Sequence, residues 1–200
     1  MSLSEQQFSI EDLHPIDIVE HLAEHNDWDF DRVADDQIAM AVEGQWRTYS
    51  ITLAWSEQDE TLRLICTFEM DPPKDRLPQL YEILNATNDM CWSGAFSYWE
   101  AQKLMVWRYG LLMAGGQTAS PEQIDTMIGA AGVSAERFYP AFQLVVWGRL
   151  DPWRRLRKLH IFVRNGPARS AASPLIAPPI RSVQNGAKTS ISIAGFRAPM

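Results

Sequence analysis

The sequence predicts an α+β fold in which three helices pack on an antiparallel sheet. Apolar and polar residues alternate over residues 38–70, which indicates two long strands and a shorter strand before them. Apolar residues recur every three or four positions over 15–25, 77–87 and 121–145, which indicates three helices. The predicted order is therefore helix, four strands, helix, two strands and a long helix, an arrangement typical of helices covering an antiparallel sheet.

Length and composition predict one domain with an appendage. The chain has 200 residues, and 46% of them are hydrophobic, so it can bury a substantial core. Its first 13 residues carry acids and no apolar run, unlike a secretory signal, and no stretch approaches the roughly 18 apolar residues of a membrane span. We therefore expect a cytoplasmic protein, in which Cys66 and Cys91 are buried, inert thiols.

The charges are divided between two parts of the chain. From Met1 to Gly148 there are 24 acidic residues against eight basic ones, whereas from Arg149 onward Asp151 is the single acid against ten basic residues. The division predicts a flexible arm at residues 1–9, an acidic domain at 10–148 and a basic tail at 149–200. The tail is rich in Pro, Ser and Arg, and we expect it to be disordered, either as a genuine ending or as an out-of-frame one.

The first half of the predicted domain begins with a helix at Pro15, which suits a first helical position because proline lacks an N–H. A short strand at 28–33 has an acidic outer side, and a second strand follows at 38–42. Gly44-Gln45 predicts a two-residue hairpin loop leading into a strand at 46–56.

The second half continues with a strand at 61–70, after which Pro72 and Pro73 end the sheet. The second helix is expected to place its inner side at Leu77, Leu80, Tyr81, Ile83, Leu84 and Thr87. After it, residues 92–99 and 103–113 predict a second hairpin. The last helix begins at Ser120-Pro121-Glu122-Gln123, in which Ser120 caps the helix and Gln123 completes a capping box. Pro140 is expected to kink this helix.

Four segments resemble the YbjN family of bacterial sensory transduction regulators. They are HPIDIVEHLAEHNDWDFDR at 14–32, the strands of 38–70, NDMCWSGAFSYWEAQKLMVWRYGLLMAGG at 88–116 and ERFYPAFQLVVWG at 136–148. The resemblance implies a fold similar to type III secretion chaperones, which typically dimerise and bind protein segments. It brings no catalytic motif and no site residues. The sequence departs from the family after Gly148, where family members continue with a short turn and an acidic helix.

The histidines of the first helix are the best candidates for metal ligands. His21 and His25 lie one helical turn apart, with Glu20 and Glu24 beside them. A zinc site requires three or four ligands, and His14 is the remaining candidate, without a convincing spacing. We therefore predict no metal and no other cofactor.

Asp27, Asp29 and Asp31 imitate the start of a calcium-binding loop. Arg32 occupies the position at which the sharp turn needs glycine, and Ile38 occupies the position of the bidentate glutamate. We therefore interpret these acids as the solvated side of a strand, where they discourage pairing with other strands.

The sequence contains no signature of an enzyme. It has no G-x-S-x-G motif, neither cysteine has a histidine at a recognisable spacing, and no glycine-rich phosphate loop precedes a helix. We predict a non-enzymatic protein, with an enzyme whose catalytic groups are dispersed along the chain as the rival class.

Aromatic residues at sheet positions and on the last helix are the predicted protein-binding surface, with a homodimer as the expected assembly. Aromatic residues on both sides of a sheet indicate either helices on both sides or an apolar patch that meets a partner. The alternative is that these residues only fill the core and loops. The predicted contact residues are Trp46, Trp55, Trp99, Trp107, Tyr109, Phe138 and Phe142.

The basic tail offers a second functional hypothesis. Residues 153–163 mix apolar side chains with four Arg or Lys residues, a composition typical of segments that bind anionic lipid or nucleic acid. The acidic domain at 10–148 would oppose such binding, so we expect no nucleic acid or membrane partner for residues 1–148.

Overall fold

The computed structural model describes residues 14–148, so the predicted arm at 1–9, the predicted start of the domain at residue 10 and the predicted tail lie outside the described residues. The described chain forms a six-stranded antiparallel sheet in the order β1-β2-β3-β4-β6-β5. The strands are β1 (Phe30–Ala34), β2 (Gln37–Glu43), β3 (Thr48–Ser56), β4 (Thr61–Glu69), β5 (Ala95–Trp99) and β6 (Leu104–Leu112). The helices are α1 (Pro15–His25), the short 3-10 helix η2 (Lys74–Arg76), α2 (Leu77–Asn88) and α3 (Pro121–Trp147). These elements confirm the predicted α+β fold and the predicted order.

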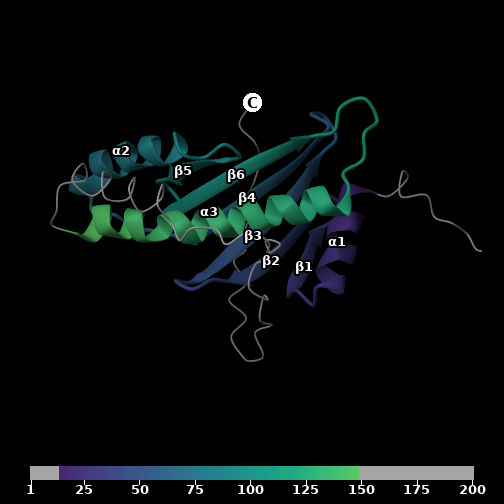
Figure 1. Cartoon of the computed structure of the whole chain (residues 1–200), viewed down its shortest axis with the longest axis horizontal. Coiled ribbons are helices and arrows are strands. Elements are labelled where there is room, and N and C mark those ends of the chain that lie inside the picture. The colour runs from purple at the N-terminus through teal and green to yellow at the C-terminus, as the bar shows by residue number, and fades with distance from the viewer. Residues whose placement is uncertain (1–13, 149–200) are drawn as a thin grey trace, which may run out of the picture.

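One face of the sheet carries the helices. Figure 1 shows α3 running along the sheet, with α1 near β1 and α2 near β5. Alternate strand side chains point toward these helices and form a single buried core with them; they include Ile38, Met40, Tyr49, Ile51, Leu53, Leu62, Leu64, Cys66, Phe68, Met105 and Trp107. The second face presents smaller or β-branched side chains such as Ser50, Thr52, Ile65 and Thr67. Among residues 14–148, no helix packs on this second face and no helix is long and apolar enough to cross a membrane.

Aromatic rings join α3 to the sheet. The ring of Phe142 lies 5.2 Å from that of Phe96 on β5 and 6.5 Å from that of Phe68 on β4, centroid to centroid. Phe138 lies one turn earlier on α3 and contacts Phe96 edge to face at 5.8 Å. Burying each phenylalanine side chain contributes about 1.5–3 kcal/mol, so these contacts hold α3 on the sheet.

The helix ends follow the sequence closely. His14 caps α1, because its Nδ1 accepts a hydrogen bond from the backbone N–H of Ile16 at 3.3 Å. At the start of α3 the Ser120 hydroxyl accepts from the Gln123 N–H, and the Gln123 side chain accepts from the Ser120 N–H. The predicted capping box is therefore confirmed, and α3 continues unbroken through Pro140.

The turn between β2 and β3 differs from the prediction. Glu43 pairs with Thr48, so the loop has four residues instead of the predicted Gly44-Gln45 pair, and Trp46 lies in the turn instead of on a strand. The Gly44 N–H closes this turn by donating to the Arg47 carbonyl at 2.9 Å. A Cβ at position 44 would lie 2.0 Å from Oε1 of Glu136 on α3, so glycine permits the turn to pack against the helix.

Two further predictions were wrong. The first strand of the second hairpin begins at Ala95 instead of residue 92, because Gly94 has a φ of 75° and turns the chain before it joins the sheet. Tyr81, which the periodicity assigned to the inner side of α2, is exposed. The inner side of α2 is formed by Leu80, Ile83, Leu84 and Thr87.

Candidate functional site

The seven predicted contact residues do not form one surface. Trp107, Phe138 and Phe142 are at most 2% exposed, so they belong to the core and offer a partner no surface in the described chain. Trp55 and Tyr109 are partly buried on the face that carries the helices. The two remaining residues are Trp99, partly buried on the opposite face, and Trp46, which is 51% exposed.

Trp46 is fixed on the surface by contacts with α3. Its ring stacks on that of Tyr139, with a centroid separation of 6.5 Å and an interplanar angle of 25°. Its backbone N–H donates to Oε1 of Glu136 at 3.4 Å. The guanidinium of Arg47 lies over the rings of Phe68 and Tyr139, at 5.8 and 5.9 Å from their centroids. The turn therefore presents an ordered aromatic residue beside α3.

Tyr49 lies beneath this turn and is not available for acid–base chemistry. Its side chain is almost fully buried near the Glu136 carboxylate. Burial and the neighbouring Glu136 charge raise the pKa of Tyr49 well above its usual value. The phenol therefore stays protonated throughout the physiological pH range.

The outward side of α3 forms a second exposed apolar surface, which we call the α3 face. It consists of Val133, Arg137, Pro140, Leu144 and Trp147, which are spaced alternately by four and three residues and so share one side of the helix. Leu144 is 42% exposed and Trp147 is 58% exposed. The same helix buries ten residues on its opposite side, so α3 is apolar on both sides.

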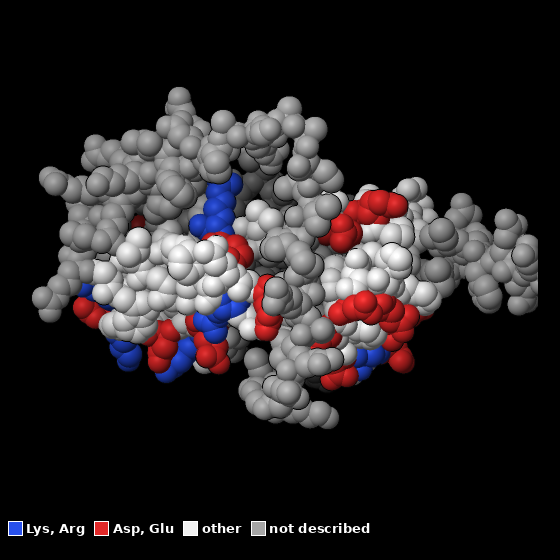
Figure 2. All heavy atoms as spheres, turned by 60° about the horizontal axis from the view of Figure 1, so that its bottom comes forward, with Lys and Arg blue, Asp and Glu red and all other residues white. Residues whose placement is uncertain are grey.

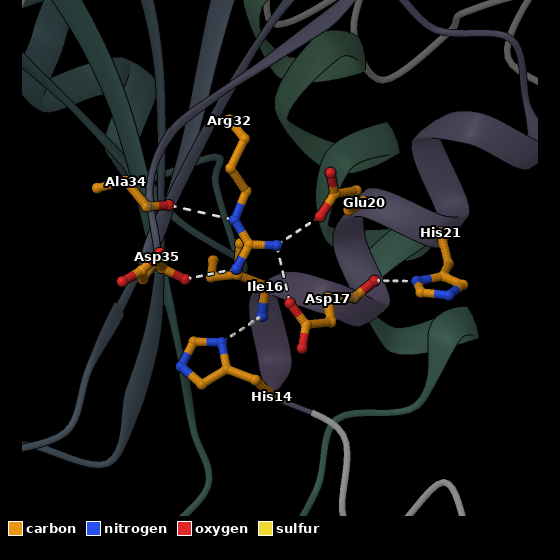
Figure 3. Close-up of polar contacts among 8 residues, drawn as sticks. All are labelled: His14, Ile16, Asp17, Glu20, His21, Arg32, Ala34 and Asp35. Carbon is orange, nitrogen blue, oxygen red and sulfur yellow. Dashed lines mark hydrogen bonds and ion pairs between the residues drawn. The ribbon is translucent and has the colours of Figure 1, made fainter. Parts of the chain in front are cut away.

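Charged side chains of α1 and β1 pair with one another. Arg32 on β1 donates to Asp17 on α1 at 2.8 Å and also to Glu20, and its side chain reaches the backbone oxygens of Ala34 and Asp35 (Figure 3). The hydrogen bond to Asp17 raises the pKa of Arg32. Asp17 and Glu20 are therefore partly exposed acids that pair with a structural arginine.

The candidate metal ligands are directed to other partners. His14 accepts from the backbone at the start of α1, and His21 donates through Nδ1 to the Asp17 carbonyl at 2.6 Å (Figure 3). Within the described range 14–148, no three His, Cys, Asp or Glu side chains gather as metal ligands would.

The negative charge is concentrated at one end of the described chain. Residues 14–46, which include α1, β1 and β2, contain nine acids and one basic residue, Arg32. Figure 2 shows red acidic side chains at this end, whereas red and blue side chains mix at the opposite end. The C-terminal part of α3 lies at that opposite end, away from the acidic residues of α1 (Figure 1).

The two thiols differ in accessibility, which gives a testable prediction. Cys66 is fully buried, and burial raises its pKa to about 12. Cys91 is only partly buried, so the expectation that both thiols are buried is wrong for Cys91. We expect Ellman's reagent to modify Cys91 in the native protein and to modify Cys66 only on unfolding, because the thiolate is the reacting species. The Cys91→Ser variant separates the two thiols, and rapid native labelling of this variant would contradict the prediction.

A pocket of about 340 Å³ lies between β6 and α3. Its apolar lining comes from Tyr109 and Leu111 on β6 and from Met127 and Ala130 on α3. The polar lining residues are Ser93, Glu122, Gln123 and Thr126. This pocket depends on how β6 lies against α3, and no motif in the sequence marks it.

Comparisons with known proteins identify the family. Residues 15–144 match the YbjN family, described as "Putative bacterial sensory transduction regulator". No curated protein matches the sequence. The fold is similar to a structure titled "Crystal structure of YbjN, a putative transcription regulator from E. coli", with a TM-score of 0.47 and 10% identity, covering 62% of this chain and 91% of that chain. Because the family match spans well over half of the sequence and confirms the resemblance seen there, this chain belongs to the YbjN family.

Proposed function

We propose that this protein is a non-enzymatic regulator that acts by binding protein, and that the α3 face is its contact surface. The observation that carries the proposal is that α3 is apolar on its outward side as well as on its buried side. A helix that is apolar on both sides is typically buried, so the exposed apolar side of α3 indicates that a partner binds there. The description of the family as a regulator agrees with this function.

A second copy of this chain is the first partner we propose for the α3 face. A two-fold axis would place the same apolar residues of two copies against each other, with Arg137 as the single charged member of the face. The acidic residues of α1 and β1 lie at the other end of the molecule from the C-terminal part of α3 (Figure 1). Two copies can therefore meet through their α3 faces without bringing their acidic ends together.

The Leu144→Glu variant tests this proposal by sedimentation velocity over a wide range of protein concentrations. We expect the wild type to be a dimer and Leu144→Glu to be a monomer, because the variant places a carboxylate in the apolar contact. Tyr81→Glu is the matched control, since Tyr81 is similarly exposed but lies on α2, and it should remain dimeric.

A wild type that stays monomeric at every concentration would contradict the homodimer. A photo-crosslinking amino acid at position 144, compared with the same group at position 81, then tests for a different protein partner in cells. Equal crosslinking from both positions, or none from position 144, would contradict the α3 face as a contact surface.

A further inference from the structure

Strand β6 is longer than the strand on its outer side. Ala95, the first residue of β5, pairs with Arg108, so β5 covers β6 only as far as that residue. Beyond it, Gly110 pairs with Arg63 and Leu112 pairs with Thr61, both on β4. Within residues 14–148, no strand lies on the other side of this last part of β6.

The backbone groups of Gly110 and Leu112 point toward this unpaired side. The Met113 N–H donates to the Glu60 carbonyl, and the Lys103 carbonyl accepts from the Met70 N–H, both at 2.8 Å and both on the β4 side. Hydrogen-bonding direction alternates along a strand, so the odd-numbered residues of β6 bond to β4. The N–H and C=O groups of Gly110 and Leu112 are therefore directed outward.

The other sheet edges carry devices that prevent strand pairing. On β1 the register shifts between Arg32 and Ala34, which breaks the regular edge. On β5 the Asn88 side chain donates to the Phe96 carbonyl at 3.0 Å and accepts from the Phe96 N–H at 2.7 Å, as a neighbouring strand would. Neither device occurs at Gly110–Leu112 within the described residues.

The pocket lies directly beside this open edge. Tyr109 and Leu111 point from β6 into the pocket, whereas Leu112 lies on the opposite face and is 68% exposed. Gly94 has a φ of 75°, and residues 91–93 before it are not part of β5. Trp92, next to the pocket residue Ser93, is fully exposed. A strand added in line with β5 would direct alternate side chains toward the pocket.

We propose that this notch, formed by the outer edge of Gly110–Leu112 and the adjoining pocket, binds an extended peptide segment of a partner protein by strand addition. An apolar side chain of the peptide occupies the pocket, and a Lys or Arg side chain lies against Glu122. This inference deepens the proposed protein-binding function but uses a surface separate from the α3 face.

Charge complementarity selects a basic peptide as the occupant. Glu122 is the single charged residue that lines the pocket, and a hydrogen bond with Ser120 lowers its pKa, so it is ionised at neutral pH. The whole chain has a net charge of −7, which favours approach of a basic segment. A second copy would instead bring another acidic domain to the notch.

The direct test measures amide hydrogen exchange of the full chain by NMR. The probe is a synthetic peptide of alternating valine and threonine with a lysine at each end. We expect it to slow exchange of the Gly110 and Leu112 amides by about tenfold or more, because both N–H groups become hydrogen-bonded. The control peptide has the same side chains but N-methylated backbone amides, and it should not slow exchange. Equal effects of the two peptides, or no effect of either, would overturn strand addition.

Two substitutions test the edge and the pocket separately. Leu112→Pro removes the outward N–H and leaves the N–H groups that bond to β4 in place. It should weaken peptide binding about tenfold. Leu112→Thr keeps the outward N–H and should weaken binding less. Ala130→Phe fills the pocket and should weaken binding more than Ala130→Ser. Thermal unfolding checks that each variant is folded. Wild-type affinity in both Leu112→Pro and Ala130→Phe would overturn the proposal.

Amide exchange rates measured before peptide is added show whether something else already occupies the notch. Slow exchange of Gly110 and Leu112 at every protein concentration would mean that residues of the same chain fill the notch. Slow exchange only at high concentration would mean that a second copy fills it. Either result overturns the partner peptide. The oligomeric state under Leu144→Glu is a separate measurement, so failure here is distinguishable from failure of the α3 face.

Discussion

Replacing Gly94 by valine should destabilise the protein by about 3 kcal/mol or more, one of the two largest effects expected of a single substitution. Gly94 has a φ of 75°, which is a conformation that β-branched residues rarely adopt. A Cβ at this position would also lie 2.2 Å from Cζ2 of the buried Trp107 ring. Backbone strain and collision with the core therefore act together, and urea unfolding monitored by circular dichroism measures their sum.

Gly115→Val is the matched control for this prediction. Gly115 has a φ of 79°, but a Cβ there would have no neighbour within 4 Å. We expect Gly115→Val to lower the free energy of unfolding by about 1–2 kcal/mol, because it introduces backbone strain without a collision. If the two variants lose equal stability, the close approach of Gly94 to Trp107 does not contribute, and the prediction is wrong.

Replacing Phe142 by alanine should cost about 3–5 kcal/mol of unfolding free energy. Phe142 is fully buried and contacts Phe68 and Phe96, so its removal leaves a cavity where α3, β4 and β5 meet. Chemical denaturation with wild-type and variant proteins at the same concentration measures the loss.

Tyr81→Ala is the control for the aromatic cluster. This variant also removes an aromatic ring from a helix, but Tyr81 is 47% exposed. Beyond the difference in helix propensity between Tyr and Ala, we expect the free energy of unfolding to change by no more than about 0.5 kcal/mol. A loss at Phe142 no larger than the loss at Tyr81 would show that the cluster does not hold α3 to the sheet.

The sequence was sufficient for the elements whose periodicity is local. Alternation over 38–42 and 61–70 predicted β2 and β4 to within a residue at each end, and Ser120 with Gln123 predicted the start of α3. Such patterns depend on neighbours along the chain, so one sequence contains them in full.

The missed boundaries depend on contacts between distant residues. Glu136 on α3 holds the turn that contains Trp46, and Trp107 on β6 lies against Gly94 before β5. Neither contact is encoded in local periodicity. The start of the strand at Thr48 and the late start at Ala95 therefore had to be read from the structure.

The candidate surfaces were predictable only in part. The sequence pointed to aromatic residues and the last helix, but alternation cannot tell which face of a sheet the helices cover, so Trp107 and Phe142 were assigned to a contact surface although they lie in the core. The notch at Gly110–Leu112 depends on where β5 ends against β6, which is a matter of register between strands.

The strand order also bears on how the chain folds. Strands β1 to β4 pair with their neighbours in sequence, but β6 must pair with β4 across α2 and β5, so that Thr61 meets Leu112. Contacts between residues far apart in sequence form slowly. During synthesis on the ribosome, the four-strand meander emerges first, and the edge of β4 stays unpaired until β6 has been translated. Chaperone protection of the nascent chain would matter most in that interval.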